Sequence, residues 1–254
     1  MKKSIIAAVV TAGLAVSASA NAEALKVGIG AEPYPPFTSP DASGNWSGWE
    51  IDFIGAVCAE AGFECEVTPV AWDGIIPALT SSKIDAIIGS MSITEERKKT
   101  IDFSDKYYNT PANVVAAKGS GITPDAEGLA GKILAVQVST IHENYAAKHF
   151  GDAEIRQYQT QDEANQDLVA GRVDATLADS LALDAFMQSA DGGCCEVAGS
   201  VAHDNEVLGP GIGIGMRKGD DRLQAFNTAI TAMRENGTYD EITKKYFDFD
   251  IYGE

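Results

Sequence analysis

Residues 79–86, Leu79-Thr80-Ser81-Ser82-Lys83-Ile84-Asp85-Ala86, are echoed by residues 168–175, Leu168-Val169-Ala170-Gly171-Arg172-Val173-Asp174-Ala175. Both stretches combine a helix end, a basic residue, a branched apolar residue and Asp-Ala, and both lead into a predicted buried strand that ends in polar residues. Many junctions between a helix and a strand look roughly like this, so coincidence is one interpretation. The other is that the chain folds into two similar α/β lobes that face each other.

The echo lies within a longer alternation of strand and helix patterns. The first unit alternates strands and helices at residues 25–30, 51–61, 63–70, 75–79 and 84–88. The second unit has strands at 133–138, 154–158 and 173–177, and helices that end near residues 150, 170 and 188. The glycine-rich residues 209–215 lead back into a strand, and two C-terminal helices follow. Strands that alternate with helices predict parallel pairing and an α/β fold.

The N-terminal residues 1–22 have the pattern of a secretory signal peptide. Lys2 and Lys3 precede an apolar run, and the small residues that follow fit cleavage after Ala20 or Ala22. The run is shorter than the ~20 residues that a membrane span needs, and no later stretch is long and apolar enough to span. We therefore expect an exported protein in an oxidising compartment, free of the membrane.

The chain is strongly acidic. Its 254 residues include 37 Asp and Glu against 19 Lys and Arg, a formal charge of −18, and loss of Lys2 and Lys3 with the signal peptide lowers this to −20. Nucleic acid and anionic membranes are excluded as partners, because their phosphates would be repelled. The hydrophobic fraction of 45% is ordinary for a globular protein, and the length suits one large or two modest domains.

The four cysteines fall into two pairs. Cys58 and Cys65 lie seven residues apart, at the end of a predicted helix and the start of the next strand, which is near enough for a disulfide. Cys194 and Cys195 are adjacent, and neighbouring Cα atoms are only ~3.8 Å apart, closer than an unstrained disulfide prefers. They form either a strained vicinal disulfide or two thiols, and the sequence leaves both open.

Polar residues follow several predicted strands, where ligands bind in such sheets. Arg97 lies on a helix turn capped by Thr94, and its guanidinium could bind a carboxylate, although an exposed arginine in a charged turn is the simpler interpretation. Thr140 opens a T-x-x-E capping box, a second place for an anion. Asp179 could accept hydrogen bonds from an ammonium or merely cap the next helix. Together these three residues describe a receptor for a zwitterion.

The remaining residues of interest are two aromatic residues and two histidines, and they form neither an enzyme motif nor a metal site. Tyr34 and Trp72 follow further strand ends and form either an apolar platform or ordinary half-buried core. No G-x-S-x-G, P-loop or H-E-x-x-H motif occurs. His142 and His149 are seven residues apart on one predicted helix, roughly 10 Å along its axis. That separation is too large for one metal ion, so we interpret both as solvated helix residues and expect no metal and no cofactor.

Several motifs resemble those of the periplasmic solute-binding proteins of polar amino-acid ABC transporters, above all the lysine/arginine/ornithine- and histidine-binding members. The resemblance spans residues 25–254 and rests on the Cys58/Cys65 spacing and on residues 48–53 (GWEIDF), 90–97 (SMSITEER), 101–105 (IDFSD) and 236–247. It implies a two-lobed type II fold in which each lobe is a mainly parallel sheet flanked by helices. Lobe I would comprise residues 23–110 and 202–254, and lobe II residues 111–201, joined by two hinge crossings near 109–112 and 199–203.

The resemblance also implies a binding role for named residues. Arg97 would hold the α-carboxylate of an amino acid, with Ser92 and the backbone N–H groups around Thr140 and Ile141. At the other end of the ligand, a carboxylate and a hydroxyl would hold the α-ammonium, and two aromatic rings would sandwich the side chain. The residues that correspond to these roles are Asp179, Ser90, Tyr34 and Trp72.

The side-chain specificity is less strongly implied. In lysine-type members a carboxylate three residues before the tyrosine binds the distal ammonium, and an ungapped match puts Ala31 there, with Glu32 beside it. Trp72 replaces the usual Phe or Leu and suits cation–π stacking. Glu32, Glu50 and Trp72 together favour a basic ligand side chain.

The resemblance thus implies a non-catalytic periplasmic receptor. It would bind arginine, lysine, ornithine or histidine between its lobes as a monomer, without a cofactor, and deliver the ligand to an ABC-transporter permease. One alternative on the same fold is a cyclohexadienyl dehydratase, for which Glu32 and Glu50 are the only acids that stand out. Another is the sensor half of a receptor, against which the absence of a second spanning segment argues.

Overall fold

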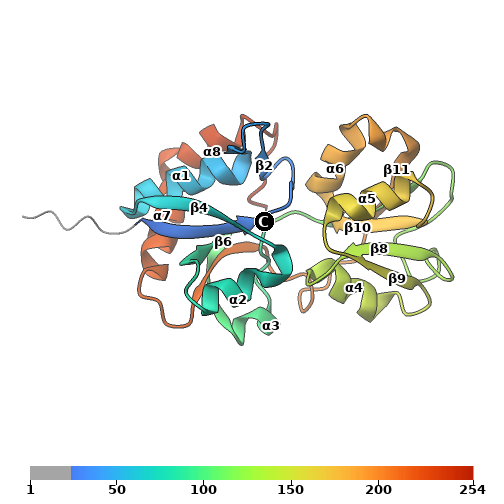
Figure 1. Cartoon of the computed structure of the whole chain (residues 1–254), viewed down its shortest axis with the longest axis horizontal. Helices are drawn as coiled ribbons and strands as arrows, with labels where there is room; N and C mark the ends of the chain where they lie inside the picture. Colours follow the sequence, from blue (N-terminus) through green and yellow to red (C-terminus); the bar gives the residue numbers. More distant parts are fainter. Residues whose placement is uncertain (1–23, 254) are drawn as a thin grey trace, which may run out of the picture.

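The computed structural model describes residues 24–253, and the predicted signal peptide with its two cleavage sites lies outside that range. Figure 1 shows two lobes side by side, joined by extended segments, with the C-terminus close to the junction. Each lobe contains one five-stranded sheet with helices packed on it. The predicted α/β, two-lobed organisation is therefore present.

The sheet of lobe I contains strands from both ends of the chain. Its strands, in spatial order, are β4 (Cys65–Val70), β1 (Leu25–Gly30), β5 (Ala86–Ile87), β12 (Ile212–Arg217) and β6 (Ile101–Tyr108). β1 pairs in parallel with β4 and β5, whereas β12 is antiparallel to β5 and β6. The flanking elements of this lobe are β2 (Ser39–Pro40), β3 (Trp46–Ser47), α1 (Trp49–Ala61), η1 (Trp72–Gly74), α2 (Ile75–Thr80), α3 (Glu95–Lys98), α7 (Leu223–Asn236) and α8 (Thr238–Thr243).

The sheet of lobe II is built in the same way. Its strands, in spatial order, are β11 (Cys195–Ser200), β7 (Ala112–Ala117), β10 (Ala175–Asp179), β8 (Ile133–Gln137) and β9 (Glu154–Tyr158). β8 pairs in parallel with β9 and β10, whereas β7 is antiparallel to β10 and β11. Its helices are α4 (Ile141–His149), α5 (Gln161–Val169), α6 (Ser180–Gln188) and η2 (Asp191–Cys194).

The chain passes between the lobes twice, from β6 to β7 and from β11 to β12. In each lobe the strand that follows the crossing, β7 or β12, is antiparallel to both of its neighbours. Four of the five strands in each sheet therefore share a direction, as a mainly parallel sheet requires. The lobe boundaries at 110/111 and 201/202 stay predictions.

The echo between residues 79–86 and 168–175 is a repeated structural junction. The Oδ2 atom of Asp85 accepts the N–H of Lys26 at 3.1 Å, and Oδ2 of Asp174 accepts the N–H of Ile133 at 2.7 Å. In return, the N–H of Asp85 donates to the carbonyl of Lys26 at 2.7 Å, and the N–H of Asp174 donates to the carbonyl of Ile133 at 2.9 Å. The junction thus places β5 beside β1 in one lobe and β10 beside β8 in the other.

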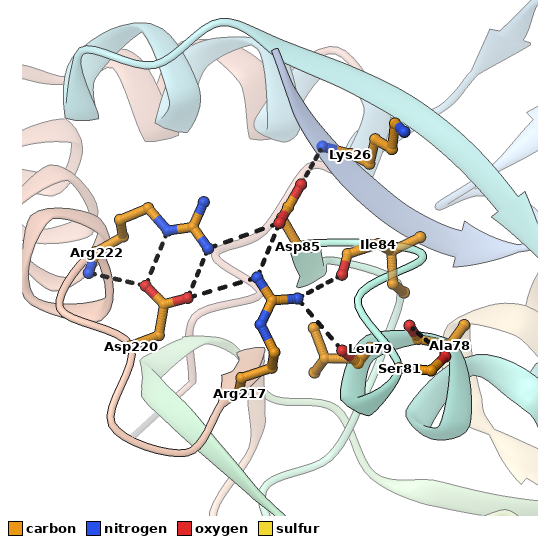
Figure 2. A network of polar contacts seen from close by, with 9 residues as sticks. All are labelled: Lys26, Ala78, Leu79, Ser81, Ile84, Asp85, Arg217, Asp220 and Arg222. Carbon is orange, nitrogen blue, oxygen red and sulfur yellow. Dashed lines mark hydrogen bonds and ion pairs between the residues drawn. The ribbon is translucent and has the colours of Figure 1, made fainter. Parts of the chain in front are cut away.

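Lobe I adds an arginine to this junction, as Figure 2 shows. Arg217 donates to Oδ1 of Asp85 at 2.8 Å and to the carbonyls of Leu79 and Ile84 at 3.3 and 2.7 Å. Arg222 approaches the same carboxylate at 3.7 Å and pairs with Asp220. Arg217 therefore ties the end of α2 to the strand that follows the second crossing.

Helix α1 begins and ends at glycines that the backbone requires. Gly48 has φ 127°, and a Cβ there would meet the carbonyl of Phe37 at 2.2 Å, whereas Gly62 ends the helix in the left-handed conformation at φ 78°. A disulfide joins Cys58 in the last turn to Cys65 at the start of β4, with Cα atoms 6.2 Å apart. The helix is therefore fastened to the sheet behind it. A second disulfide joins the adjacent residues 194 and 195, the pair that the sequence left open.

Candidate ligand-binding cleft

A cavity lies between the lobes, at the carboxyl ends of β1, β5, β8 and β9. All residues predicted to bind ligand line it except Asp179. Asp179 lines a second cavity, which adjoins the first and reaches the two crossings. The two cavities share the residues Tyr34, Ser90, Ser92, Ile141 and His142. The nine predicted residues are therefore brought together in one two-part cleft.

Arg97 faces this cleft rather than open solvent. Thr94 caps α3 by accepting the N–H of Arg97 at 3.2 Å, and the guanidinium donates to the carbonyls of Ser92 at 2.9 Å and Ser139 at 3.2 Å. Its Cζ lies 5.7 Å from the centroid of the Trp72 ring. Burial lowers the pKa of Arg97 to about 10, still far above neutrality. No carboxylate among residues 24–253 pairs with it, so the charge is available to an anion.

The neighbouring lysines of α3 behave differently. Lys98 pairs with Glu95 at 2.9 Å, and Lys99 pairs with Glu96, all four being exposed. The interpretation of a charged, solvated turn therefore applies to them and not to Arg97.

The N-terminus of α4 provides further donors. Thr140 caps the helix by accepting the N–H of Glu143 at 3.1 Å, as predicted. The reciprocal bond differs from the predicted capping box, because Glu143 accepts the N–H of Ser139 at 2.6 Å instead of that of Thr140. The N–H groups of Ile141 and His142 have no acceptor within the described chain. Both residues line the cleft, where these groups can bind an anion.

Asp179 ends β10 and caps α6. Its Oδ1 atom accepts the N–H groups of Leu181 at 2.8 Å and Ala182 at 3.4 Å, and Oδ2 accepts the hydroxyl of Thr110. The capping interpretation is therefore correct, yet the carboxylate also lines the hinge-side cavity. Burial raises its pKa to about 6, and no ion pair within residues 24–253 involves it. A cation that enters the cavity would stabilise the ionised form of Asp179, which burial makes unfavourable.

The two aromatic residues predicted as a platform are half-buried and line the first cavity. Tyr34 lies in the turn after β1 and stacks on Phe37, with ring centroids 6.0 Å apart. Trp72 opens η1, and its Nε1 donates to the carbonyl of Ser139 at 3.2 Å across the cleft. Because Arg97 donates to the same carbonyl, Ser139 of lobe II joins two side chains of lobe I.

Three further polar residues line the cavity, namely Glu32, Gln137 and Gln161, and sequence reasoning missed the two glutamines. Glu32 accepts the N–H of Trp72 at 3.4 Å. Gln137 is the last residue of β8, and Gln161 is the first of α5, directly after β9. Both are nearly buried and line the cavity. The rule that ligands lie at the carboxyl ends of strands would have identified both glutamines.

The histidine interpretation needs a correction. His142 is not a solvated helix residue, because it lines both cavities, and burial together with the charge of Arg97 lowers its pKa to about 3. It is therefore neutral at pH 7. His149 lies at the other end of α4 and contacts Asp204 at 2.7 Å, outside the cleft.

Glu50 lines the cavity from the first turn of α1, where its side chain is fully buried. Its Oε1 atom accepts the N–H of Ser90 and the hydroxyl of Tyr107, and Oε2 accepts the hydroxyl of Ser90. The carboxylate is therefore held by neighbours within lobe I. Within residues 24–253, no three His, Cys, Asp or Glu side chains are placed to hold a metal, and no helix has the length and apolarity of a membrane span.

The comparison with protein families settles the relationship. The model for bacterial extracellular solute-binding proteins, family 3, matches residues 25–249. The chain belongs to this family. The predicted family and the predicted two-lobed type II fold are both confirmed.

Individual members of the family are similar over nearly the whole chain. The L-arginine-binding protein of Pseudomonas aeruginosa is 41% identical over 258 residues, covering 100% of this chain and 99% of the relative. The lysine/arginine/ornithine-binding periplasmic protein of Escherichia coli is 40% identical, covering 100% of both. A solved ancestral arginine-binding protein bound to arginine has a TM-score of 0.80 at 35% identity, covering 88% of this chain and 98% of that one. This family 3 protein is thus similar to binding proteins rather than to enzymes.

Proposed function

We propose that this protein is an extracytoplasmic receptor that binds a basic L-amino acid between its lobes, with arginine the preferred ligand. One observation carries the proposal: two adjoining cavities hold the guanidinium of Arg97 and the carboxylate of Asp179, and neither has an ion-pair partner among residues 24–253. A zwitterion offers the complementary charges in one molecule. Arg97 binds its α-carboxylate with Ser92 and the free N–H groups at the start of α4.

The ammonium and the side chain of the ligand extend away from Arg97. Asp179 and the hydroxyl of Ser90 accept hydrogen bonds from the α-ammonium. Tyr34 and Trp72 enclose the aliphatic part, and their rings favour a positive charge above them. Both rings line the cavity from lobe I, so lobe II covers the ligand on closure.

The cavity also offers hydrogen-bond acceptors to the ligand side chain, and these favour a guanidinium. The Nε2 atom of Gln161 donates to Asn165 and Thr176, both at 2.9 Å, and Thr176 in turn donates to the carbonyl of Ala135. Nε2 of Gln137 donates to the carbonyl of Gln159 at 3.1 Å. These partners fix the orientation of both amides and leave the two Oε1 atoms as acceptors, and the carboxylate of Glu32 lines the same cavity. A guanidinium has five donors and no acceptor, whereas an ammonium has three.

Export and delivery complete the proposed function. Residues 1–22 act as a signal peptide that is cleaved after Ala20 or Ala22. The E. coli relative is named as a periplasmic protein, which supports the same location here. The lobes close on the ligand around the two crossings, and the closed form is presented to an ABC-transporter permease.

The dehydratase alternative has less support. The relatives reported above are binding proteins, and the two acids that it would use, Glu32 and Glu50, already accept hydrogen bonds within lobe I. We therefore prefer the receptor function.

Calorimetric titration of unfolded, dialysed and refolded protein tests the proposal. L-arginine is expected to bind with a dissociation constant of about 1 μM or tighter, about 8 kcal/mol, and at least ~10-fold tighter than lysine, ornithine or histidine. Citrulline is the matched control ligand, because it replaces one guanidinium nitrogen by an acceptor oxygen, and we expect it to bind ~100-fold more weakly than arginine. No heat with any amino acid would contradict the receptor function, and equal affinity for arginine and citrulline would contradict the preference.

A further inference from the structure

Glu50 holds Ser90 in an unusual conformation at the edge of the cleft. Ser90 follows Gly89 at the end of β5 and has φ 57°, a left-handed value that is uncommon for a residue with a side chain. Oε1 of Glu50 accepts the N–H of Ser90 at 2.6 Å and the hydroxyl of Tyr107 at 2.5 Å. Oε2 accepts the hydroxyl of Ser90 at 3.0 Å. The carboxylate therefore fixes both the backbone and the side chain of Ser90.

This arrangement decides how Ser90 meets a ligand. A serine hydroxyl has one proton to donate and two lone pairs to accept with. Since the proton is donated to Glu50, Oγ of Ser90 turns lone pairs toward the cleft that it lines. An ammonium, which only donates, is the matching group, and a ligand acceptor would meet no proton there.

Glu50 also carries a charge that the protein does not neutralise. It is fully buried, and the groups that face it are the hydroxyl of Tyr107 and, at longer range, Tyr34, Tyr108 and Asp179. The three tyrosines are neutral, because burial holds their pKa values well above the ordinary range. No ion pair among residues 24–253 includes the carboxylate of Glu50 or that of Asp179. The charge that acts on Glu50 is that of Asp179, which has the same sign.

Burial is the main reason that both carboxyl groups hold protons at a higher pH than usual, Glu50 near pH 7 and Asp179 near pH 6. Burial raises the pKa of Glu50 to about 7, with a further rise from Asp179, and burial raises the pKa of Asp179 to about 6. A positive charge placed between them favours their ionised forms. Entry of an ammonium thus shifts the protonation of the pair in one direction only, toward loss of a proton.

We propose that Glu50 is a positioning residue of the ammonium site: it orients Ser90 as an acceptor and, together with Asp179, releases a proton to solvent when the ligand ammonium binds. The inference rests on the proposed function, because it concerns the same cleft. The O–H bond of the carboxylic acid breaks, its proton goes to the buffer, and the carboxylate that remains is compensated by the ligand ammonium. Ligand affinity therefore rises with pH across the range in which the pair would otherwise hold protons.

The number of protons released is measurable by titration with L-arginine in phosphate and in Tris, whose heats of ionisation differ. The wild-type protein should release about 0.6 proton per ligand at pH 7, rising to about 1.4 at pH 6, because the pKa values of Glu50 and Asp179 are about 7 and about 6. Glu50→Gln, which is close to isosteric, should release less than about a fifth of a proton at pH 7 and bind arginine more weakly. Glu235→Gln, an exposed position on α7, is the control and should release as many protons as wild type.

A second variant keeps the test decisive if Glu50→Gln does not fold. The Tyr107 hydroxyl lowers the pKa of Glu50, so Tyr107→Phe should raise proton release at pH 7 above the wild-type value. A purely structural role of Glu50 would leave proton release unchanged in both variants. The inference is overturned if arginine binds to wild type with the same heat in both buffers at pH 6 and 7, or if Glu50→Gln releases as many protons as wild type. Absence of binding by every amino acid would instead refute the receptor function.

Discussion

Two serines at the edge of the cleft have nearly the same backbone but opposite surroundings. Ser90 in lobe I and Ser139 in lobe II have φ values of 57° and 60°, and a glutamate accepts the N–H of each at 2.6 Å. The glutamate at Ser90 is Glu50, fully buried, whereas the one at Ser139 is Glu143, partly exposed in the first turn of α4. The conformation is shared, so the burial of the charge is what differs.

The difference separates a cation-binding end from an anion-binding end. On the side of Ser90 lie the carboxylates of Glu50 and Asp179, which form no ion pair within the described part of the chain, and around Ser139 lie the guanidinium of Arg97 and the start of α4. A buried charge without a partner costs stability, and such groups concentrate at functional sites. We infer that the cost at Ser90 is offset when the ligand binds, whereas Glu143 binds the N–H of Ser139 and the side-chain amide of Gln157.

The largest expected effect follows from breaking the anion-binding end. Arg97→Ala should weaken arginine binding by about 4 kcal/mol, roughly 1,000-fold in Kd, because the ligand carboxylate loses a buried, charge-assisted partner. Lys98→Ala is the matched control, since Lys98 is exposed and paired with Glu95, and its affinity should stay within about twofold of wild type. Calorimetric titration measures both, and wild-type affinity in Arg97→Ala would remove the central assignment.

Breaking the cation-binding end should have the next largest effect. Asp179→Asn removes the charge but keeps a residue that caps helices well, so α6 should persist. Arginine affinity should fall by about 3 kcal/mol, ~100-fold, when measured by the same titration. Asp162→Asn, on the first turn of α5, is a control that should leave affinity unchanged. Equal affinity of wild type and Asp179→Asn would show that the ammonium lies elsewhere.

The buried charge should also affect the stability of the ligand-free protein. The pKa of Glu50 is raised from 4.5 to about 7, so the folded state binds more protons than the unfolded state in that window, and the free energy of unfolding falls as pH rises through it. Glu50→Gln should therefore be more stable than wild type at pH 8, by on the order of 2 kcal/mol, with no gain at pH 4.5.

The corresponding change at the other serine sharpens the comparison. Glu143→Gln should give no stabilisation at pH 8, because Glu143 is partly exposed. Urea unfolding at both pH values measures the difference. An equal gain in the two variants would mean that burial does not distinguish Glu50 from Glu143.

The smallest effect concerns the two lobes away from the cleft. Asp85→Asn should destabilise the protein by about 1 kcal/mol, because it weakens the bond with Arg217, whereas Asp174→Asn should cost about half as much. The pKa of Asp85 is lowered, so ionised Asp85 stabilises the folded protein at pH values above the ordinary pKa of an aspartate. This stabilisation is lost as pH falls through the lowered value. Urea unfolding at pH 7 and pH 3 checks this, and a larger loss in Asp174→Asn would contradict it.

Local signals in the sequence predicted the parts of the fold that depend on neighbouring residues. Thr94 caps α3, as predicted, and the predicted helix at residues 51–61 ends where Gly62 adopts the left-handed conformation. Strands β6, β7 and β11 were not assigned from strand patterns. β6 and β7 follow each other without an intervening helix, so the alternation that revealed the other strands does not apply to them.

The cleft was predictable only in part. The strand-end rule and the family resemblance named residues that do line the cleft, Glu50 among them, but neither gave the hydrogen-bond partners of Glu50. Its true partners are distant in sequence, since Ser90 is 40 residues away and Tyr107 is 57. Only packing brings these groups together and buries the charge, and no local pattern encodes that.

A crystal structure of the refolded protein with L-arginine tests the central claim most directly. The ligand should lie between the lobes, with its α-carboxylate on the guanidinium of Arg97 and its α-ammonium within hydrogen-bonding distance of Asp179 and Ser90. Its guanidinium should meet the acceptors Glu32, Gln137 and Gln161. A ligand bound outside the cleft, or bound in it with the α-carboxylate away from Arg97, would contradict the account.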